Sequence, residues 1–244
     1  MKKEYYVFKI NLVTLNVIAI IIAIIAGAIA CFIDYDLALR CVAIFEDTKM
    51  CLLLLPYMLG YMILHELLHA IGYIIHGADS RKITFGMDLE KGVLYCLCKQ
   101  DVTRRNILNA SMYPLFYIGI VTFVISIIFK WPLLLLLSII NISGAAGDIM
   151  YFIFISKLDK NIMFSELDDG IAFAVLSDKD VTKVNHFGLD FVEKLPEIPR
   201  SDFERVKISK LSWSFVIISL VAIIGAIFIW KLFKIAINAI FFCL

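Results

Sequence analysis

The sequence predicts an all-α polytopic membrane protein, with about five transmembrane helices and a small cytoplasmic β-hairpin between the second and third. Of its 244 residues, 61% are apolar and 18% are charged, and the mean hydropathy is +0.90. Soluble domains are nearer to about one half apolar and one quarter charged. The apolar residues form long blocks rather than amphipathic stripes, which is typical of segments that cross a bilayer.

Five apolar segments are long enough to cross a hydrocarbon core of about 30 Å. The third and fourth are separated only by Lys130 and Trp131, which predicts a tight helical hairpin. Trp131, Trp213 and Trp230 fall at predicted span ends, where an aromatic belt would place them. Together the segments predict a single integral membrane domain over residues 1–244, with spans at roughly 12–33, 51–75, 110–129, 132–156 and 212–230.

The distribution of Lys and Arg predicts a cytoplasmic N-terminus. With that orientation, residues 1–11, 76–109 and the loop 157–211 are cytoplasmic, and they hold eighteen of the 23 Lys and Arg residues. Positive charge is concentrated on the cytoplasmic side of membrane proteins. The Ile- and Lys-rich composition suggests a bacterial source, so we expect the bacterial cytoplasmic membrane.

The segments outside the spans contain short elements of their own. Residues 82–98 hold two strand-like runs with turn residues between them at 88–92, which predicts the β-hairpin. In the loop, residues 171–176 are strand-like, and the apolar spacing of residues 181–195 favours a helix.

Charge and cysteine usage exclude some classes of protein. A net charge of +1 and the lack of a basic patch with interleaved aromatics argue against nucleic-acid binding. The six cysteines contain no C-x-x-C pair and do not form a disulfide framework. Cys96 and Cys98 are better explained as two small residues on one face of a strand than as ligands of a second metal.

Few ionisable residues lie inside the predicted spans. They are His65, Glu66, His69 and Asp148. Because a charged side chain in a bilayer is costly, each of them is a candidate functional residue.

The first three form the motif His65-Glu66-Leu67-Leu68-His69, which is H-E-x-x-H. On a helix, positions i and i+4 share one face, so the two imidazoles can bind one Zn²⁺ and the glutamate can act on a water molecule beside it. The alternative is a buried polar cluster that only packs helices together.

A catalytic zinc needs a third protein ligand, and Asp148 is the candidate in another span. It follows small residues, Gly144 to Gly147, which allow close helix approach. Counted at 1.5 Å per residue, His65 and Asp148 lie at similar depths. Asp168 and Asp169, just beyond the fourth span, are the rival ligands, although Asp-Gly also favours a surface turn.

Other polar or conformationally restricted residues have simpler explanations. Asn141 lies on the same helical face as Asp148 and could donate to a substrate carbonyl, but a bond to a neighbouring helix is the favoured explanation. We expect His76 and His186 to be surface histidines. We expect Pro56 and Pro114 only to kink their helices.

These residues predict a zinc-dependent intramembrane or membrane-embedded endopeptidase, surrounded by the lipid bilayer, that hydrolyses peptide bonds of membrane-associated protein or peptide substrates. The depth of the cleavage site is left open. Glu66 would take a proton from water and pass it to the leaving amine. One alternative is a zinc-binding membrane protein without hydrolytic activity. Another is an ion or proton transporter that uses the same His, Asp and Glu cluster. The substrate and the oligomeric state are left open.

The H-E-x-x-H motif within a span, the cytoplasmic hairpin and a later span with the third ligand resemble the site-2-protease (M50-like) class of intramembrane metalloproteases. The sequence is more similar to a bacterial zincin-peptidase group, the DUF3267 family, over roughly residues 55–175. The resemblance rests on the motif, the Tyr95-Cys96 stretch, Ala110 to Pro114 and Ser143 to Asp148. It implies zinc ligation by the two histidines and Asp148, and acid/base catalysis by Glu66. Site-2 proteases commonly have Gly after the third ligand, whereas this chain has Ile149.

Overall fold

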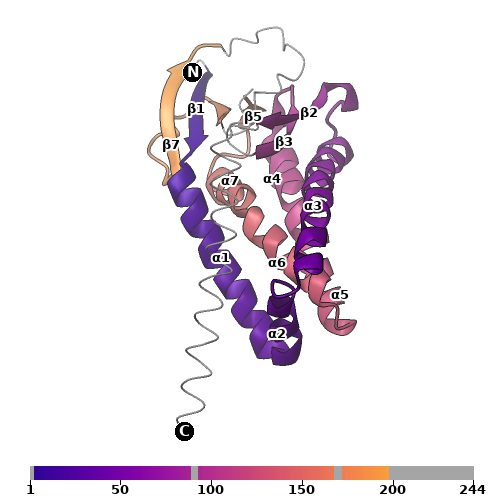
Figure 1. Cartoon of the computed structure of the whole chain (residues 1–244). Coiled ribbons are helices and arrows are strands. Elements are labelled where there is room, and N and C mark those ends of the chain that lie inside the picture. Colours follow the sequence, from indigo (N-terminus) through magenta and orange to yellow (C-terminus); the bar gives the residue numbers. More distant parts are fainter. Residues whose placement is uncertain (1–2, 89–92, 168–171, 198–244) are drawn as a thin grey trace. The chain divides into compact units, whose positions relative to one another are not determined.

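The computed structural model describes residues 3–88, 93–167 and 172–197 (Figure 1). The chain divides into two units, one of residues 1–86 with 94–206 and one of residues 87–93 with 207–244. Every residue of the candidate site lies in the first unit.

The described elements alternate between long helices and short strands. Helix α4 leads into a π-helical stretch, η2, at Pro114 and from there into α5. In chain order the elements are β1 (Glu4–Ile10), α1 (Leu12–Ile33), α2 (Tyr35–Ala43), α3 (Thr48–Ile75), η1 (Ser80–Lys82), β2 (Ile83–Asp88), β3 (Val93–Cys98), β4 (Val102–Thr103), α4 (Arg104–Pro114), η2 (Leu115–Val121), α5 (Thr122–Ile128), α6 (Pro132–Gly144), α7 (Ala146–Ser156), β5 (Met163–Glu166), β6 (Ala172–Ser177) and β7 (Leu189–Leu195).

Within the described residues, three helices are long and apolar enough to cross a membrane. They are α1, α3 and the continuous helix Arg104–Ile128, and the pair α6 and α7 makes a fourth if the two helices, bent by 41°, count as one span. Large apolar side chains of α1 and α3 point outward, among them Ile24 and Leu52, which are 65% and 64% exposed. Apolar surface of this extent needs an apolar environment, so the protein is membrane-associated.

Polar residues fix where these helices begin. The side chain of Asn11 accepts from the backbone N–H of Thr14, and Asp47 and Thr103 cap α3 and α4 in the same way. Helix α1 is rich in β-branched isoleucine, yet it is helical, because a helix satisfies its own backbone hydrogen bonds in an apolar environment.

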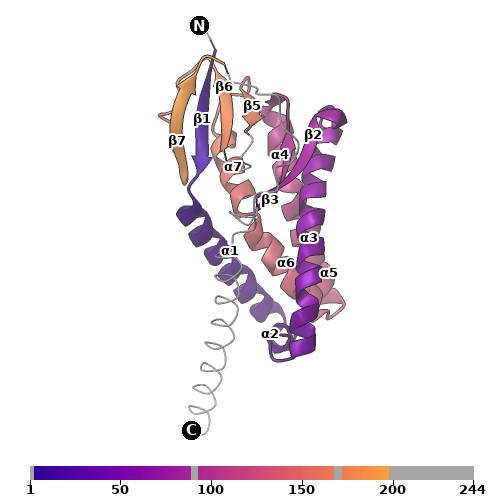
Figure 2. The same cartoon turned by 45° about the horizontal axis from the view of Figure 1, so that its top comes forward.

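The strands form two antiparallel sheets. One is the hairpin of β2 and β3, and the other has five strands in the order β4-β5-β6-β1-β7 (Figure 2). Strand β1 is central to the larger sheet, where Val7 pairs with Ala174 of β6 and Glu193 of β7. The ring of Phe8 is fully buried and stacks on Phe173.

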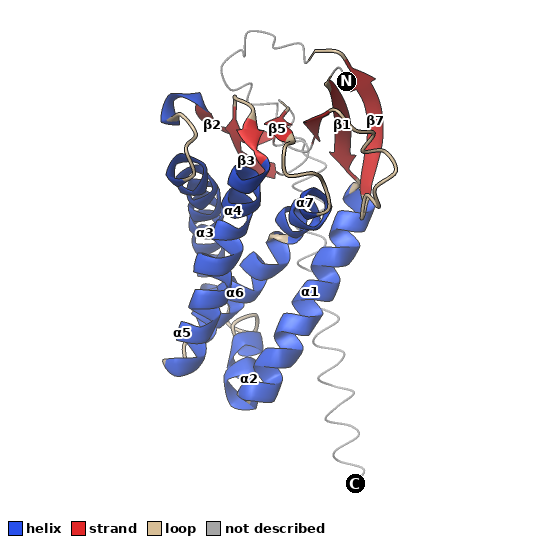
Figure 3. Cartoon of the chain, turned by 180° about the vertical axis from the view of Figure 1, so that it is seen from behind, coloured by secondary structure: helices blue, strands red, loops and turns tan. Residues whose placement is uncertain are grey.

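The strands gather at one end of the helices (Figure 3). Strand β1 immediately precedes α1, the hairpin follows α3, and β5 follows α7. Because β1 pairs with β6, residues 4–10 and 172–177 lie on the same side of the helices. The polar segments of the first unit thus meet next to the helix ends.

The expected all-α fold with about five spans is wrong. Seven strands in two antiparallel sheets accompany the helices, and three helices, or four with the bent pair, meet the requirements of a span among the described residues. The sheet was missed because β1 consists of only seven residues directly before a span and pairs with strands more than 160 residues later. The predicted span 212–230 lies outside the described residues.

Outside the spans, two of the three predicted elements are confirmed. The hairpin forms from β2 and β3, with its predicted turn at 89–92 outside the described residues, and the strand predicted at 171–176 is β6. The helix predicted at 181–195 is wrong. Positive φ angles at Phe187 and Gly188 prevent a continuous helix, and residues 189–195 pair with β1 as β7.

Replacement of Phe8 by alanine should destabilise the unit strongly. The ring lies 4.8 Å from that of Phe154 on α7, centroid to centroid, so it joins the sheet to the helices. We expect a loss of about 3–5 kcal/mol, seen as a lower melting temperature in detergent. Val192→Ala on β7, where the side chain is exposed, is the control and should change little. Equal melting temperatures of Phe8→Ala and wild type would contradict this packing.

Candidate metal centre

Helix α3 carries the H-E-x-x-H motif on the face that packs against α4 and α6. His65 and His69 are one turn apart, and their Nε2 atoms lie 3.1 Å from each other. Their side chains are only 14% and 12% exposed. The helical spacing therefore directs both imidazoles to one point, as the motif predicts.

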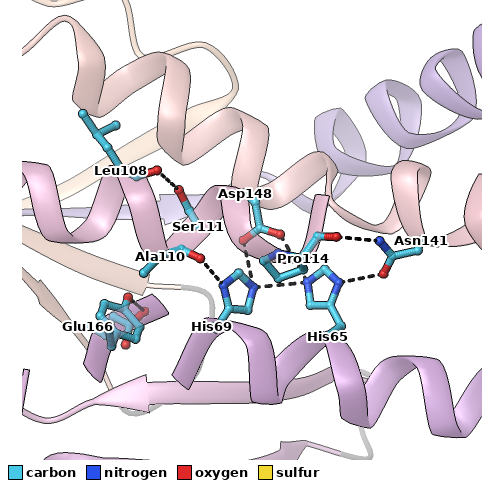
Figure 4. Close-up of polar contacts among 10 residues, drawn as sticks. His65, His69, Leu108, Ala110, Ser111, Pro114, Asn141, Asp148 and Glu166 are labelled. Atoms are coloured by element: carbon cyan, nitrogen blue, oxygen red, sulfur yellow. Dashed lines mark hydrogen bonds and ion pairs between the residues drawn. The ribbon is translucent and has the colours of Figure 1, made fainter. Parts of the chain in front are cut away.

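Asp148 reaches this point from α7. Its two carboxylate oxygens each lie 3.3 Å from one Nε2 atom, Oδ2 from His65 and Oδ1 from His69 (Figure 4). The bend at Ala145 starts a new helix, so Asp148 occupies the first turn of α7, where the helix dipole favours a negative charge. Helix α7 packs chiefly on α4.

The outer nitrogens of both imidazoles are held by backbone or amide oxygens. His69 Nδ1 lies 3.0 Å from the carbonyl oxygen of Ala110, and His65 Nδ1 lies 3.0 Å from Oδ1 of Asn141. The Asn141 amide nitrogen donates to the carbonyl of Pro114 at 3.2 Å, which fixes the orientation of the amide. Since these oxygens can only accept, each Nδ1 carries a hydrogen, and each ring turns its Nε2 toward the Asp148 carboxylate.

Two Nε2 atoms and a carboxylate therefore converge on one point. A neutral ring has a lone pair at this nitrogen, so the group calls for positive charge, which a proton or a metal ion can supply. Ligands at about 2.0–2.1 Å from a tetrahedral zinc are separated by about 3.3 Å. The observed separations of 3.1, 3.3 and 3.3 Å agree with that value. The residues thus fit a zinc ion, and their role as its ligands stays a prediction.

Glu66 lies beside the same point. One of its carboxylate oxygens and a nitrogen of each histidine lie within 4.8 Å of one another. In the described part of the chain, Glu66 and the two histidines therefore form a group of side chains that could bind a metal ion. The backbone N–H of Cys96, on β3, donates to the Glu66 carboxylate. The hairpin thus contacts the predicted catalytic glutamate.

The remaining candidates from the sequence differ in their positions. Asn141 forms hydrogen bonds with neighbouring helices, which was the favoured explanation of this residue. The rival ligands Asp168 and Asp169 lie outside the described residues. His76 lies beside Asn109 and Tyr113 and is partly buried. His186 is not an ordinary surface histidine, because its ring packs edge-on against Phe8 and its Nε2 is buried without a partner.

Sequence analysis missed Glu166, which ends β5 close to the centre (Figure 4). Its carboxylate accepts from the Tyr73 hydroxyl at 2.7 Å and from the backbone N–H of Cys98 at 2.6 Å. Tyr73 lies one turn after His69 on the same face of α3. This spacing was the signal in the sequence that Tyr73 and its partner lie near the centre. Glu166 was overlooked because only ionisable residues inside the spans were considered.

Cys96 and Cys98 are both buried on β3, as predicted. Burial raises the pKa of the Cys98 thiol to about 12, and it raises the pKa of Cys96 further. Both thiols are therefore protonated at neutral pH, which disfavours metal binding because a thiolate is the ligand form.

The comparisons with known proteins agree with this geometry at the level of a family. A model of the DUF3267 family, described as "Putative zincin peptidase", matches residues 58–163. This segment contains the H-E-x-x-H motif and Asp148, and the match confirms the resemblance to this family. The family description supports a peptidase that binds zinc. Neither a curated protein nor a solved structure matches the chain.

The stability of the protein should depend on the ionisation of Glu166. Burial raises the pKa of this carboxyl from about 4.5 to about 7, although its two hydrogen bonds oppose the rise. Between these values the unfolded chain releases a proton that the folded protein keeps. Stability is therefore full below about pH 4.5 and is lost as pH rises to about 7, by on the order of 3 kcal/mol.

The measurement is the melting temperature of the metal-free protein in detergent across this pH range. Glu166→Gln cannot ionise, so the fall should be smaller in this variant than in the wild type. Glu193→Gln, at an exposed position on β7, is the matched control and should keep the wild-type slope. The same fall of melting temperature with pH in Glu166→Gln and wild type would contradict the assignment of this pH dependence to Glu166.

Proposed function

We propose that this chain, which matches the DUF3267 family over residues 58–163, is a membrane-embedded zinc-dependent endopeptidase that acts on membrane-associated proteins or peptides. His65, His69 and Asp148 would hold the metal, and Glu66 would be the catalytic acid/base. The site would lie within the bilayer, since three of these residues are on α3 and the fourth is on α7.

The observation that carries the proposal is the convergence of two imidazole nitrogens and a carboxylate beside a glutamate. The histidine Nε2 atoms and the Asp148 carboxylate lie 3.1–3.3 Å apart, which is the spacing of ligands around a tetrahedral zinc. A cluster that only joins helices does not require this mutual spacing of three ligand atoms. A proton path would not require the one-turn spacing of two histidines with a glutamate between them.

A zinc ion held there would supply a Lewis acid, which polarises a scissile carbonyl and makes water a stronger nucleophile at neutral pH. Glu66 would take the proton of the attacking water and deliver it to the leaving nitrogen. The Cys96 N–H holds its carboxylate in place from β3. The ligand side chains are 12–14% exposed, so the site is not sealed from water or substrate.

A helical substrate hides its peptide carbonyls in its own hydrogen bonds, so the cleaved segment must be extended. The β2–β3 hairpin is a candidate partner for such a segment, because strands can be added at a sheet edge. Its strand β3 already contacts Glu66. This arrangement would bring an extended peptide next to the catalytic residues.

The zinc content of the detergent-purified protein tests the ligand set. We expect about one zinc per wild-type chain, and none in His65→Ala or Asp148→Ala, because each removes one of three protein ligands. His76→Ala is the matched control, since His76 lies outside the cluster, and it should retain zinc. A wild-type protein without zinc, even when zinc is supplied during expression, would overturn the proposal.

Glu66→Gln separates an enzyme from a protein that only binds zinc. The variant keeps all three ligands and should retain zinc. Cleavage of fluorescein-labelled casein in detergent should fall by about 10²- to 10⁴-fold, because the general base is lost. Cleavage at the wild-type rate would show that Glu66 does not have this role.

We also propose that the N-terminus and the sheet are cytoplasmic, in the bacterial cytoplasmic membrane. The pairing of β1 with β6 puts residues 4–10 and 172–177 on one side, and that side carries the excess of Lys and Arg. A protease site inserted at residues 178–180 should be cut in inside-out vesicles and protected in intact spheroplasts. The reverse pattern would contradict this orientation.

A further inference from the structure

Pro114 interrupts the helix that faces the two histidines. It lies at the end of α4, immediately before the π-helical stretch η2. Proline has no backbone N–H, so the carbonyl of Ala110, four residues earlier, lacks its usual helical donor. The next backbone N–H, that of Leu115, donates to Met112 instead. The carbonyl of Ala110 is thus available to a side chain.

His69 uses this carbonyl. Its Nδ1 lies 3.0 Å from the Ala110 oxygen, and Ala110 itself is fully buried. The bond fixes both the tautomer and the orientation of the ring, so that Nε2 points at Asp148. A regular α-helix at this position would occupy the same oxygen with a backbone N–H.

His65 is held at the same part of the helix, through Asn141. The carbonyl of Pro114 accepts the amide of Asn141 at 3.2 Å, and the Asn141 oxygen accepts from His65 Nδ1 at 3.0 Å. Both imidazoles are therefore oriented by carbonyls within one turn of a single broken helix (Figure 4).

Two glycines permit these contacts. A Cβ atom added at Gly72, on α3, would lie 2.8 Å from the Cα of Ala110, so a larger residue would push α4 away from His69. A Cβ added at Gly119 would lie 3.3 Å from the Asn141 amide nitrogen and 3.0 Å from Ile142. All three distances are shorter than ordinary van der Waals contact.

We propose that Pro114 is a positioning residue, which orients His69 through the carbonyl it releases at Ala110. The inference rests on the proposed function, because it concerns the same ligands. It goes beyond the sequence-based expectation that Pro114 only kinks its helix. Groups that hold the outer nitrogen of a ligating histidine typically change metal affinity by about 10- to 100-fold when they are lost.

The two roles of a proline in a helix predict opposite effects of alanine. If Pro114 only kinks the helix, Pro114→Ala should strengthen the helix and leave zinc affinity unchanged. If Pro114 positions the ligands, the new N–H of Ala at 114 competes for the Ala110 carbonyl, and zinc affinity falls while helix content is kept or increased.

The experiment compares Pro114→Ala with Pro56→Ala. Pro56 is a matched control, because it is an exposed proline inside α3 that takes no part in the bond between His69 and Ala110. Zinc affinity is measured by competition with a chelator. The tautomer of the histidines is measured by ¹⁵N NMR of the histidine-labelled, metal-free protein. We expect zinc binding weaker by about 10- to 100-fold in Pro114→Ala, with loss of the uniform Nδ1–H signal of His69. Pro56→Ala should match the wild type in both measurements.

Gly72→Ala is the second variant and serves if Pro114→Ala fails to fold. It displaces Ala110 from His69 without adding a helical N–H. We again expect weaker zinc binding and loss of the uniform Nδ1–H signal of His69. Wild-type zinc affinity and an unchanged His69 tautomer in the folded variant would overturn the inference and leave the proposed function intact. If the wild-type protein binds no zinc, the proposed function fails, and the tautomer in the metal-free variants still decides whether Pro114 orients His69.

Discussion

The structure depends on one constraint, which is that negative charge and lone pairs inside apolar helices must be balanced. His65, His69 and Asp148 bring acceptors together within 3.3 Å, in helices whose outer surfaces are apolar. Water cannot solvate such a group fully, because the side chains are 12–14% exposed. A divalent cation held there would balance the charge and would also provide the chemistry of a hydrolase.

Two interruptions of helical regularity support this centre. The bend at Ala145 gives Asp148 a helix N-terminus of its own, and Pro114 releases a carbonyl for His69. In an apolar environment an unpaired backbone group is costly, so a broken helix persists only where side chains satisfy the released groups. Here the side chains that do so, His69 and Asn141, are the candidate ligand and the partner of the other ligand.

The sheet and hairpin are joined to the same helix that carries the motif. Glu166 at the end of β5 accepts from Tyr73 on α3 and from the backbone of Cys98 on β3. The neighbouring Cys96 N–H donates to Glu66. Strands β5 and β3 and helix α3 thus meet at the Glu166 carboxylate, and a movement of the hairpin would also displace the backbone beside Glu66. The sheet is therefore part of the site's framework and not a separate appendage.

The sequence by itself determined the apolar spans at 12–33, 51–75, 110–129 and 132–156, the hairpin, and the four candidate residues. These follow from local properties, because hydropathy and the 3.6-residue period act within one segment. It also indicated that Asp148 could reach the level of the histidines, since rise per residue sets depth.

Only the tertiary structure decided the five-stranded sheet, the link through Glu166 and the use of the Ala110 carbonyl. Strand β1 is stabilised by partners more than 160 residues away, and seven mostly apolar residues do not specify such a pairing. A proline in a helix indicates that a carbonyl has lost its donor, but it does not indicate what will use that carbonyl. That depends on how closely Gly72 allows α3 to approach Ala110, which is a property of two helices packed together.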